Sequence, residues 1–159
     1  MKRHTLSVLT NDHPGVLQRI AGLFARRGYN IESITVGSSE RETFSRMTIV
    51  AAGDDRIRDQ IVLQLAKLID VIDVTLLDAK PMVSRELMLV KLQAGPGERA
   101  DIMAIAESFR CAVVDVSPGT LIVQVVGDFA KNNALLQLLR PFRVVELTRT
   151  GETAMSRSS

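Results

Sequence analysis

Tryptophan is absent from the 159 residues, and one tyrosine and five phenylalanines bring the aromatic content to only 4%. This shortage bears on RNA binding, because sheets that bind single-stranded RNA stack the bases on aromatic side chains of their central strands. The two segments that read as central strands, "TLSVLT" and "TFSRMTIV", carry one phenylalanine between them. The sequence therefore lacks a base-stacking platform.

Cysteine and histidine are also scarce. Cys111 is the one cysteine, so no internal disulfide can form, and its place at the start of an apolar strand predicts a buried structural thiol. His4, which we expect at the surface, and His13 have no second histidine or cysteine at metal-site spacing. Asp54 and Asp55 stand at an expected helix start and predict a cap. Since phosphate-loop and nucleophile-elbow motifs are missing too, we expect no catalytic residue and no metal site.

Long hydrophobic runs and clustered charges are missing as well. No apolar run approaches the ~20 residues of a membrane span, and the N-terminus "MKRHTLSVLTND" lacks the apolar core of a signal peptide. The 20 basic and 18 acidic residues give a formal charge of +2, and they are interleaved along the chain. A nucleic-acid binder gathers its basic residues on one face. We expect a cytoplasmic protein that binds neither membranes nor nucleic acid.

What is present is a regular alternation of strand-like and helix-like patterns. After the turn "NDHPG", Val16, Ile20 and Leu23 recur at helical spacing until Gly28. The predicted order in the first half is a strand at 5–10, a helix from Pro14 to Arg27, strands at 30–36 and 43–51, a helix opening at Gly53-Asp54, and a strand at 71–77.

The second half repeats this order. We predict a strand at 86–93, a helix entered through "GPGERADIMAIAESF", strands at 111–116 and 120–126, a helix from Gly127-Asp128 to Arg140, and a strand at 142–148. The segments "HPG" and "GPG" stand at equivalent strand-to-helix turns, as do "VAAGDD" and "VVGDF" at the second pair of turns. The sequence therefore predicts an α+β fold of two tandem βαββαβ domains.

Composition places the domain boundaries. The first domain is expected at 1–77 and the second at 86–150, joined by the linker 78–85, "DAKPMVSR", which has proline, serine and charges without periodicity. Residues 151–159 predict a flexible tail. In a βαββαβ unit both helices cover one face of the sheet and leave the other open. Because open faces and strand edges invite a partner, we expect an oligomer.

The turn at residues 11–17 is the candidate binding site. The first turn of a helix leaves N–H groups without partners, and together with the helix dipole these groups favour a carboxylate or a phosphate. Gly15 has no side chain to block a ligand from the main chain, and Pro14 has no N–H group. The expected donors are therefore the N–H groups of Gly15, Val16 and Leu17.

The polar residues before the proline allow two interpretations. Asn11 and Asp12 add polar groups to the site, and Asp12 suits an ammonium group. A ligand with a carboxylate, an ammonium group and apolar surroundings suggests an amino acid. In the structural interpretation, Asp12 or His13 only caps the helix and the Pro-Gly pair only shapes the turn.

The stretch "NDHPGVLQRIAGLFARRGYNIESITVG", followed by "SRMTIV", closely resembles the N-terminal ACT domain of the acetolactate synthase (acetohydroxyacid synthase) small-subunit family. The segments "SRELMLVKLQA" and "VVELTRTGETAMSR" resemble the same family, so the likeness spans nearly the whole chain. Its specific part is "RGYNIESITVG" with "SRMTIV", since the Pro-Gly turn alone indicates only some ACT domain. The resemblance implies two ferredoxin-like domains, the first of them an ACT domain.

The resemblance also implies a function in branched-chain amino-acid (valine, isoleucine, leucine) biosynthesis. Small subunits of this family are non-catalytic: they bind the catalytic large subunit, raise its activity and mediate feedback inhibition by valine, in some members by leucine or isoleucine. Thiamine diphosphate, Mg²⁺ and FAD are expected on the large subunit and no cofactor in this chain. The family's ACT domains pair side by side in a homodimer, with the effector at their interface.

Carried over to this sequence, the turn 11–17 of one chain faces Asn30 and Ile31 of the other. Asn30 is expected to hydrogen-bond the polar end of the effector, and Ile31 to line the pocket for its branched side chain. The family's turn commonly reads Glu-Asn-x-Pro-Gly-Val-Leu, so Asp12 stands where an amide is usual. Asp12 favours the ammonium group of a ligand and repels its carboxylate, so this departure bears on the strength of valine feedback.

One other function stays open on the sequence, that of a free-standing ACT-type amino-acid sensor serving a different enzyme or a transcription regulator. The second domain keeps a Pro-Gly turn but lacks the polar pair before it, which argues against a second amino-acid site there.

Overall fold

The computed structural model describes residues 2–158, which form two compact units. Residues 2–83 and 151–158 make up the first unit, and residues 84–150 make up the second. Each unit has its own hydrophobic core. The chain thus leaves the first unit once and returns to it at its C-terminal end.

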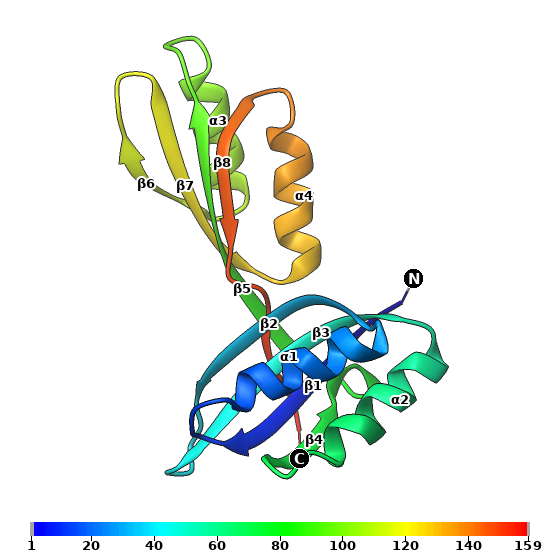
Figure 1. The fold of residues 1–159 in the computed structure, drawn as a ribbon. Helices are drawn as coiled ribbons and strands as arrows, with labels where there is room; N and C mark the ends of the chain where they lie inside the picture. The colour runs from blue at the N-terminus through cyan, green and yellow to red at the C-terminus, as the bar shows by residue number, and fades with distance from the viewer. Residues whose placement is uncertain (1, 159) are drawn as a thin grey trace. The chain divides into compact units, whose positions relative to one another are not determined.

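The first unit is a four-stranded antiparallel sheet with two helices on one face (Figure 1). Its strand order is β2-β3-β1-β4. Its elements are β1 (Lys2–Asn11), α1 (Val16–Arg27), β2 (Asn30–Ser38), β3 (Phe44–Gly53), α2 (Asp55–Ala66) and β4 (Val71–Leu76). This is the predicted βαββαβ order.

Local sequence signals explain both helices. The apolar stripe of α1, with Ile20 and Phe24 fully buried, packs against the sheet. Gly28 ends α1 in the left-handed conformation at φ 68°, and its N–H donates to carbonyls of the last turn. At the start of α2, Asp54 accepts a hydrogen bond from the Ile57 N–H at 2.8 Å. The predicted cap at Asp54 is therefore confirmed.

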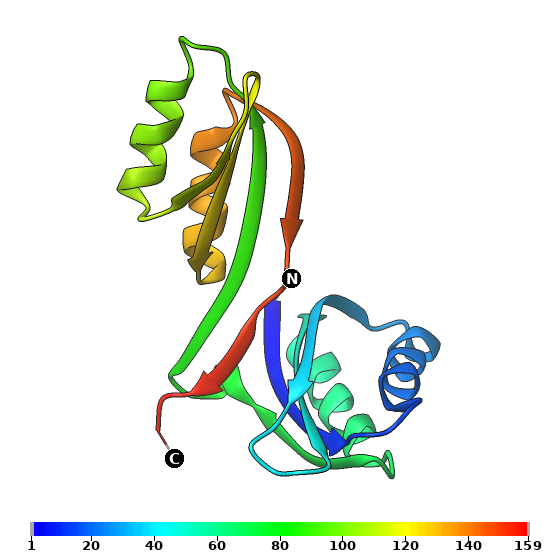
Figure 2. The ribbon, with the colours of Figure 1, turned by 90° about the vertical axis from the view of Figure 1, so that its left-hand side faces the viewer.

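The second unit repeats the arrangement, and Figure 2 shows both of its helices on one side of its sheet. Its strands are ordered β6-β7-β5-β8. Its elements are β5 (Met82–Gln93), α3 (Arg99–Ser108), β6 (Ala112–Val116), β7 (Thr120–Gly127), α4 (Phe129–Leu139) and β8 (Arg143–Arg149). The predicted α+β fold of two tandem βαββαβ units is confirmed.

The predicted linker 78–85 contains the boundary between the two units, which falls after Val83, but most of it has regular structure. A 3-10 helix, η1 (Leu77–Ala79), follows β4 directly, and β5 already begins at Met82. Leu77 is buried, and the Asp78 Oδ1 accepts a hydrogen bond from the Thr5 N–H at 2.8 Å. These contacts order the segment although it shows no periodicity.

His4 is buried, although its charged sequence neighbours led us to expect it at the surface. Only 2% of the residue is exposed, and its Nε2 lies 3.0 Å from the Gly53 carbonyl oxygen. Its Nδ1 lies 3.3 Å from the Asp78 Oδ2. His4 therefore ties β1 to the end of β3 and to η1.

The C-terminal segment, residues 151–158, is ordered, so the predicted flexible tail is wrong there. It contains β9 (Thr153–Ser156), which pairs with β5, and Gly151, Glu152 and Ala154 are buried. Residue 159 lies outside the described part of the chain.

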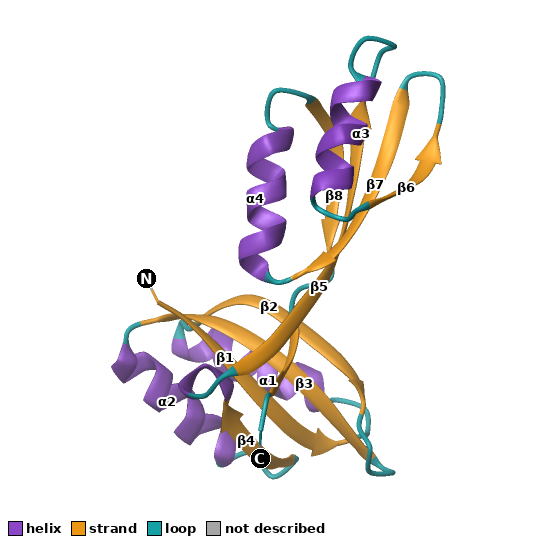
Figure 3. Ribbon diagram, turned by 180° about the vertical axis from the view of Figure 1, so that it is seen from behind, coloured by secondary structure: helices purple, strands orange, loops and turns teal. Residues whose placement is uncertain are grey.

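This segment also corrects the expectation of an open sheet face. The Thr35 hydroxyl donates to the Glu152 carbonyl at 3.2 Å, and the Ala154 N–H donates to the Thr48 hydroxyl at 3.3 Å. Thr48 points away from α1 and α2, because its strand neighbours Met47 and Ile49 belong to the core on the helix side. The C-terminal segment thus covers part of the face opposite the helices (Figure 3).

Candidate functional site

The turn between β1 and α1 has the main-chain geometry that an anion site needs. Gly15 adopts φ 91°, a left-handed conformation that favours glycine, and α1 begins at the next residue. No side chain caps this helix end. The first N–H groups of α1, from Val16 and Leu17, therefore have no side-chain partner, and the interpretation of Asp12 or His13 as a cap is wrong.

Asn11 and His13 point instead to Asp70, in the connection between α2 and β4. The Asn11 N–H donates to the Asp70 carbonyl at 2.9 Å, and its side-chain amide lies 3.4 Å from the Asp70 Oδ1. The His13 Nε2 lies 2.8 Å from the same oxygen, and Arg19 pairs with the Asp70 Oδ2. Two of the predicted ligand residues therefore hold the turn in place in this chain.

Asp70 is 7% exposed. Burial alone raises the pKa of its carboxyl, but the hydrogen bond from Asn11 and the charges of His13 and Arg19 outweigh burial and hold the pKa below its ordinary value. Asp70 is therefore ionised at neutral pH. Asp70 could not be predicted as part of the site, because a lone acid before an apolar strand carries no sequence signal of its partners.

Asp12 is the member of the polar pair that stays in solvent. Its N–H donates to the Thr43 carbonyl at 2.8 Å, which ties the turn to the connection between β2 and β3. Its side chain is exposed. Together with exposed Pro14 and Gly15, it leaves one side of the turn open to a ligand.

Asn30 and Ile31 begin β2, just beyond the other end of α1. Asn30 is exposed and pairs with Ala52, while Ile31 is half-buried against the core. The 12 residues of α1 extend about 18 Å at a rise of about 1.5 Å per residue. Within one chain, the Gly15 turn and Asn30 are therefore too far apart to hold the same amino acid.

Comparison with known proteins reveals the family. Residues 6–73 match the model of the small subunit-like ACT domain of AHAS, and residues 85–158 match that of the small subunit of acetolactate synthase. A "Probable acetolactate synthase small subunit" of Methanothermobacter thermautotrophicus is 55% identical over 157 residues, covering 98% of this chain and 94% of that protein. The chain belongs to the acetolactate synthase small-subunit family.

Other relatives cover the chain almost completely. The acetolactate synthase small subunit of Mycobacterium bovis is 48% identical over 156 residues, covering 98% of this chain and 93% of that protein. The crystal structure of the acetolactate synthase small subunit from Thermotoga maritima superimposes with a TM-score of 0.90 at 40% identity. The superposition covers 100% of this chain and 99% of the Thermotoga maritima chain. The resemblance read from the motifs is therefore confirmed, and so is the fold that it implied.

The second Pro-Gly turn of this small subunit does not reproduce the first. Among residues 2–158, the glycines with positive φ are Gly15, Gly28 and Gly151, so neither Gly95 nor Gly97 adopts the left-handed conformation. α3 begins only at Arg99. The geometry of the candidate site is thus restricted to the ACT domain.

Within residues 2–158, no three His, Cys, Asp or Glu side chains are grouped to hold a metal ion, and no helix combines the length and apolar character required to cross a membrane. Cys111 is half-buried, and burial raises the pKa of its thiol. A raised pKa disfavours the thiolate, the form that acts as nucleophile.

Proposed function

We propose that this chain is a non-catalytic regulatory subunit that binds the catalytic large subunit of acetolactate synthase, raises its activity and mediates feedback inhibition by valine. Membership of the small-subunit family and the exposed main-chain donors at Gly15 support this function. Thiamine diphosphate, Mg²⁺ and FAD, and with them the chemical steps, belong to the large subunit in this proposal.

The separation of Gly15 from Asn30 along α1 is the observation that carries the proposed effector site. Since one chain cannot bring both to one amino acid, a site that uses both needs two copies of the chain. β2 is an edge strand of its sheet, and an edge strand offers unpaired main-chain groups to a second copy. A homodimer paired through the ACT domains places the turn of one chain opposite Asn30 of its partner copy.

In this site the N–H groups after Gly15 bind the effector's carboxylate, and the exposed Asp12 side chain stands beside that carboxylate and repels it. Asn30 of the second chain adds a hydrogen bond, and Ile31 supplies apolar contact for the branched side chain. The two-fold symmetry of such a dimer creates two identical sites. Each pair of chains therefore binds two valine molecules.

Valine at this interface acts on a remote active site only if it binds one arrangement of the subunits more tightly than another. The two arrangements in our proposal are an activating and an inhibited pose of the small subunits on the large one. A coupling free energy of ~1–3 kcal/mol corresponds to roughly 5–150-fold changes in affinity. That range is sufficient for feedback control.

Reconstitution tests the function. The purified chain is mixed with the acetolactate synthase large subunit of its own organism, and turnover is measured with and without valine. We expect turnover to rise on mixing and to fall again with valine. Valine binding without any change in turnover would instead indicate a free-standing amino-acid sensor for another protein.

Replacing Asp12 by asparagine is expected to tighten valine binding several-fold and to lower the valine concentration needed for inhibition. The change removes an exposed negative charge beside the site for the effector's carboxylate and restores the amide usual in the family. Calorimetric titration with valine measures the affinity. An Asp59→Asn variant, which removes an exposed carboxylate on α2, is the control. Equal affinities of the Asp12→Asn variant and the wild type would show that Asp12 plays no part in recognition.

A further inference from the structure

A cavity of about 550 Å³ opens between the first half of α1 and the connection from α2 to β4. Its walls are apolar and are formed by Val16, Ile20, Leu68 and Val71. Cavities of this size with mostly apolar walls are typical of binding sites. The cavity lies wholly within the first unit.

Ile69 stands at the rim of this cavity and is 95% exposed. A large aliphatic side chain in water has no role in the core of its own chain. A large apolar side chain beside an apolar cavity forms the kind of patch that marks protein–protein contacts. A small molecule bound inside the cavity would leave the Ile69 side chain exposed to water, because Ile69 projects into solvent. A protein surface would cover both the cavity and Ile69.

The rim of the cavity carries more basic groups than acidic ones. His13, Arg19 and Lys67 contribute basic groups, and Asp70 contributes the carboxylate, which Asn11, His13 and Arg19 already satisfy. Lys67 is exposed and forms no ion pair with any residue in the described part of the chain. A partner that fits this rim carries carboxylates around an aliphatic side chain.

From this combination we infer that the cavity and its rim, which we call the docking surface, bind the catalytic large subunit. An aliphatic side chain of the large subunit enters the cavity, its neighbouring carboxylates face Arg19 and Lys67, and Ile69 packs on the large subunit. This inference rests on the proposed function, since it assigns the surface through which activation is transmitted. The effector turn uses main-chain groups at Gly15 and the docking surface uses side chains, so the two can be altered separately.

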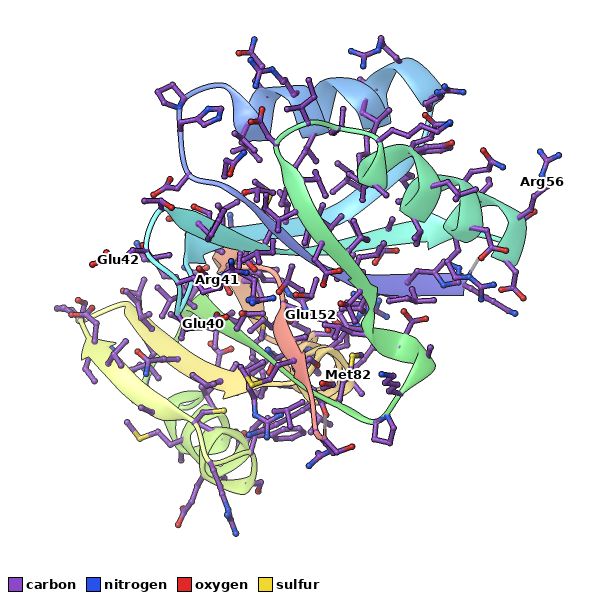
Figure 4. The ribbon with its side chains drawn as sticks, turned by 90° about the horizontal axis from the view of Figure 1, so that it is seen from below. Glu40, Arg41, Glu42, Arg56, Met82 and Glu152 are labelled. Atoms are coloured by element: carbon purple, nitrogen blue, oxygen red, sulfur yellow. The ribbon has the colours of Figure 1, made fainter. Side chains whose placement is uncertain are left out.

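Two substitutions test the docking surface without threatening the fold. Ile69→Glu changes a side chain with almost no contacts in its own chain, and Lys67→Glu reverses an exposed charge. The matched controls are Leu63→Glu, at a 56% exposed apolar residue of α2, and Arg56→Glu, at a cation that projects outward from α2 (Figure 4). Neither control residue lines the cavity. Circular dichroism checks that all four variants fold.

The measurement is the turnover of the large subunit as a function of added small subunit. We expect each docking-surface variant to raise the small-subunit concentration for half-maximal activation about tenfold or more, while both controls follow the wild type. Calorimetric valine affinity is expected to stay unchanged in all four variants.

The outcomes separate this inference from the proposed function. If the wild type and the Ile69 and Lys67 variants all activate at the same concentrations, the large subunit does not bind the docking surface. The proposed regulatory function then still holds. If valine affinity changes while the activation curves coincide, the cavity binds a small molecule and the inference is overturned. If the wild type itself fails to activate, the proposed function fails and the inference with it.

Discussion

Replacing Gly15 by alanine is expected to abolish valine inhibition of the reconstituted enzyme and to weaken valine binding by about tenfold or more. Gly15 adopts φ 91°, a conformation in which alanine is strained. The turn therefore either shifts or keeps this conformation at a free-energy cost of about 1 kcal/mol. The added methyl group meets no atom of its own chain within 4 Å. It therefore occupies the open space through which a ligand reaches the main chain.

Activation in the absence of valine is expected to remain in the Gly15→Ala variant, because Gly15 lies outside the docking surface. Gly97→Ala is the matched control, since it places a methyl group in equally open space at the second Pro-Gly turn without positive φ. The two variants are compared by calorimetry and by inhibition of turnover. Full valine inhibition of the Gly15→Ala enzyme would show that the main-chain N–H groups after Gly15 do not bind the effector.

Replacing Arg3 by alanine is expected to lower the free energy of unfolding by about 3 kcal/mol. The Arg3 Nη2 lies 2.5 Å from the Glu152 Oε1, and the Glu152 side chain is only 3% exposed. Without Arg3 this carboxylate stays buried and uncompensated, which costs more than the loss of an exposed pair. Arg3 also pairs with Glu32 of β2 at 2.6 Å.

Chemical denaturation measures this loss. Adding Glu152→Gln to the Arg3→Ala chain is expected to restore much of the stability, because it removes the unpaired charge. Lys2→Ala is the control, since its ion pair with Asp55 is exposed on both sides and contributes little. Equal stability of the Arg3→Ala variant and the wild type would show that the C-terminal segment is not held by this pair.

The parts of the fold that the sequence predicted correctly rest on local signals. α1 follows from an apolar stripe between a Pro-Gly entrance and a glycine stop, and each signal lies within a few residues of the structure that it determines. Asp54 and Asp128 accept hydrogen bonds from the N–H groups three residues later, as capping residues do. Because the second half of the sequence repeats these signals, the two-domain fold could be predicted.

The parts that could not be predicted depend on contacts between distant residues. The C-terminal segment carries no apolar periodicity, and its order depends on Glu152 meeting Arg3, 149 positions away. His4 is likewise buried by Gly53 and Asp78, which the sequence does not link to it. At the candidate site, the Pro-Gly turn indicated where α1 begins, whereas the left-handed conformation of Gly15 was not predicted. The pairing of Asn11 and His13 with Asp70 depends on tertiary packing.

The most direct test of the shared effector site is calorimetric titration of the wild-type chain with valine, with the oligomeric state of the same sample measured by solution scattering. We predict a dimer that binds two valine molecules, one for each Gly15 turn opposite Asn30 of the second copy. Single chains that release no heat with valine, leucine or isoleucine would contradict the account.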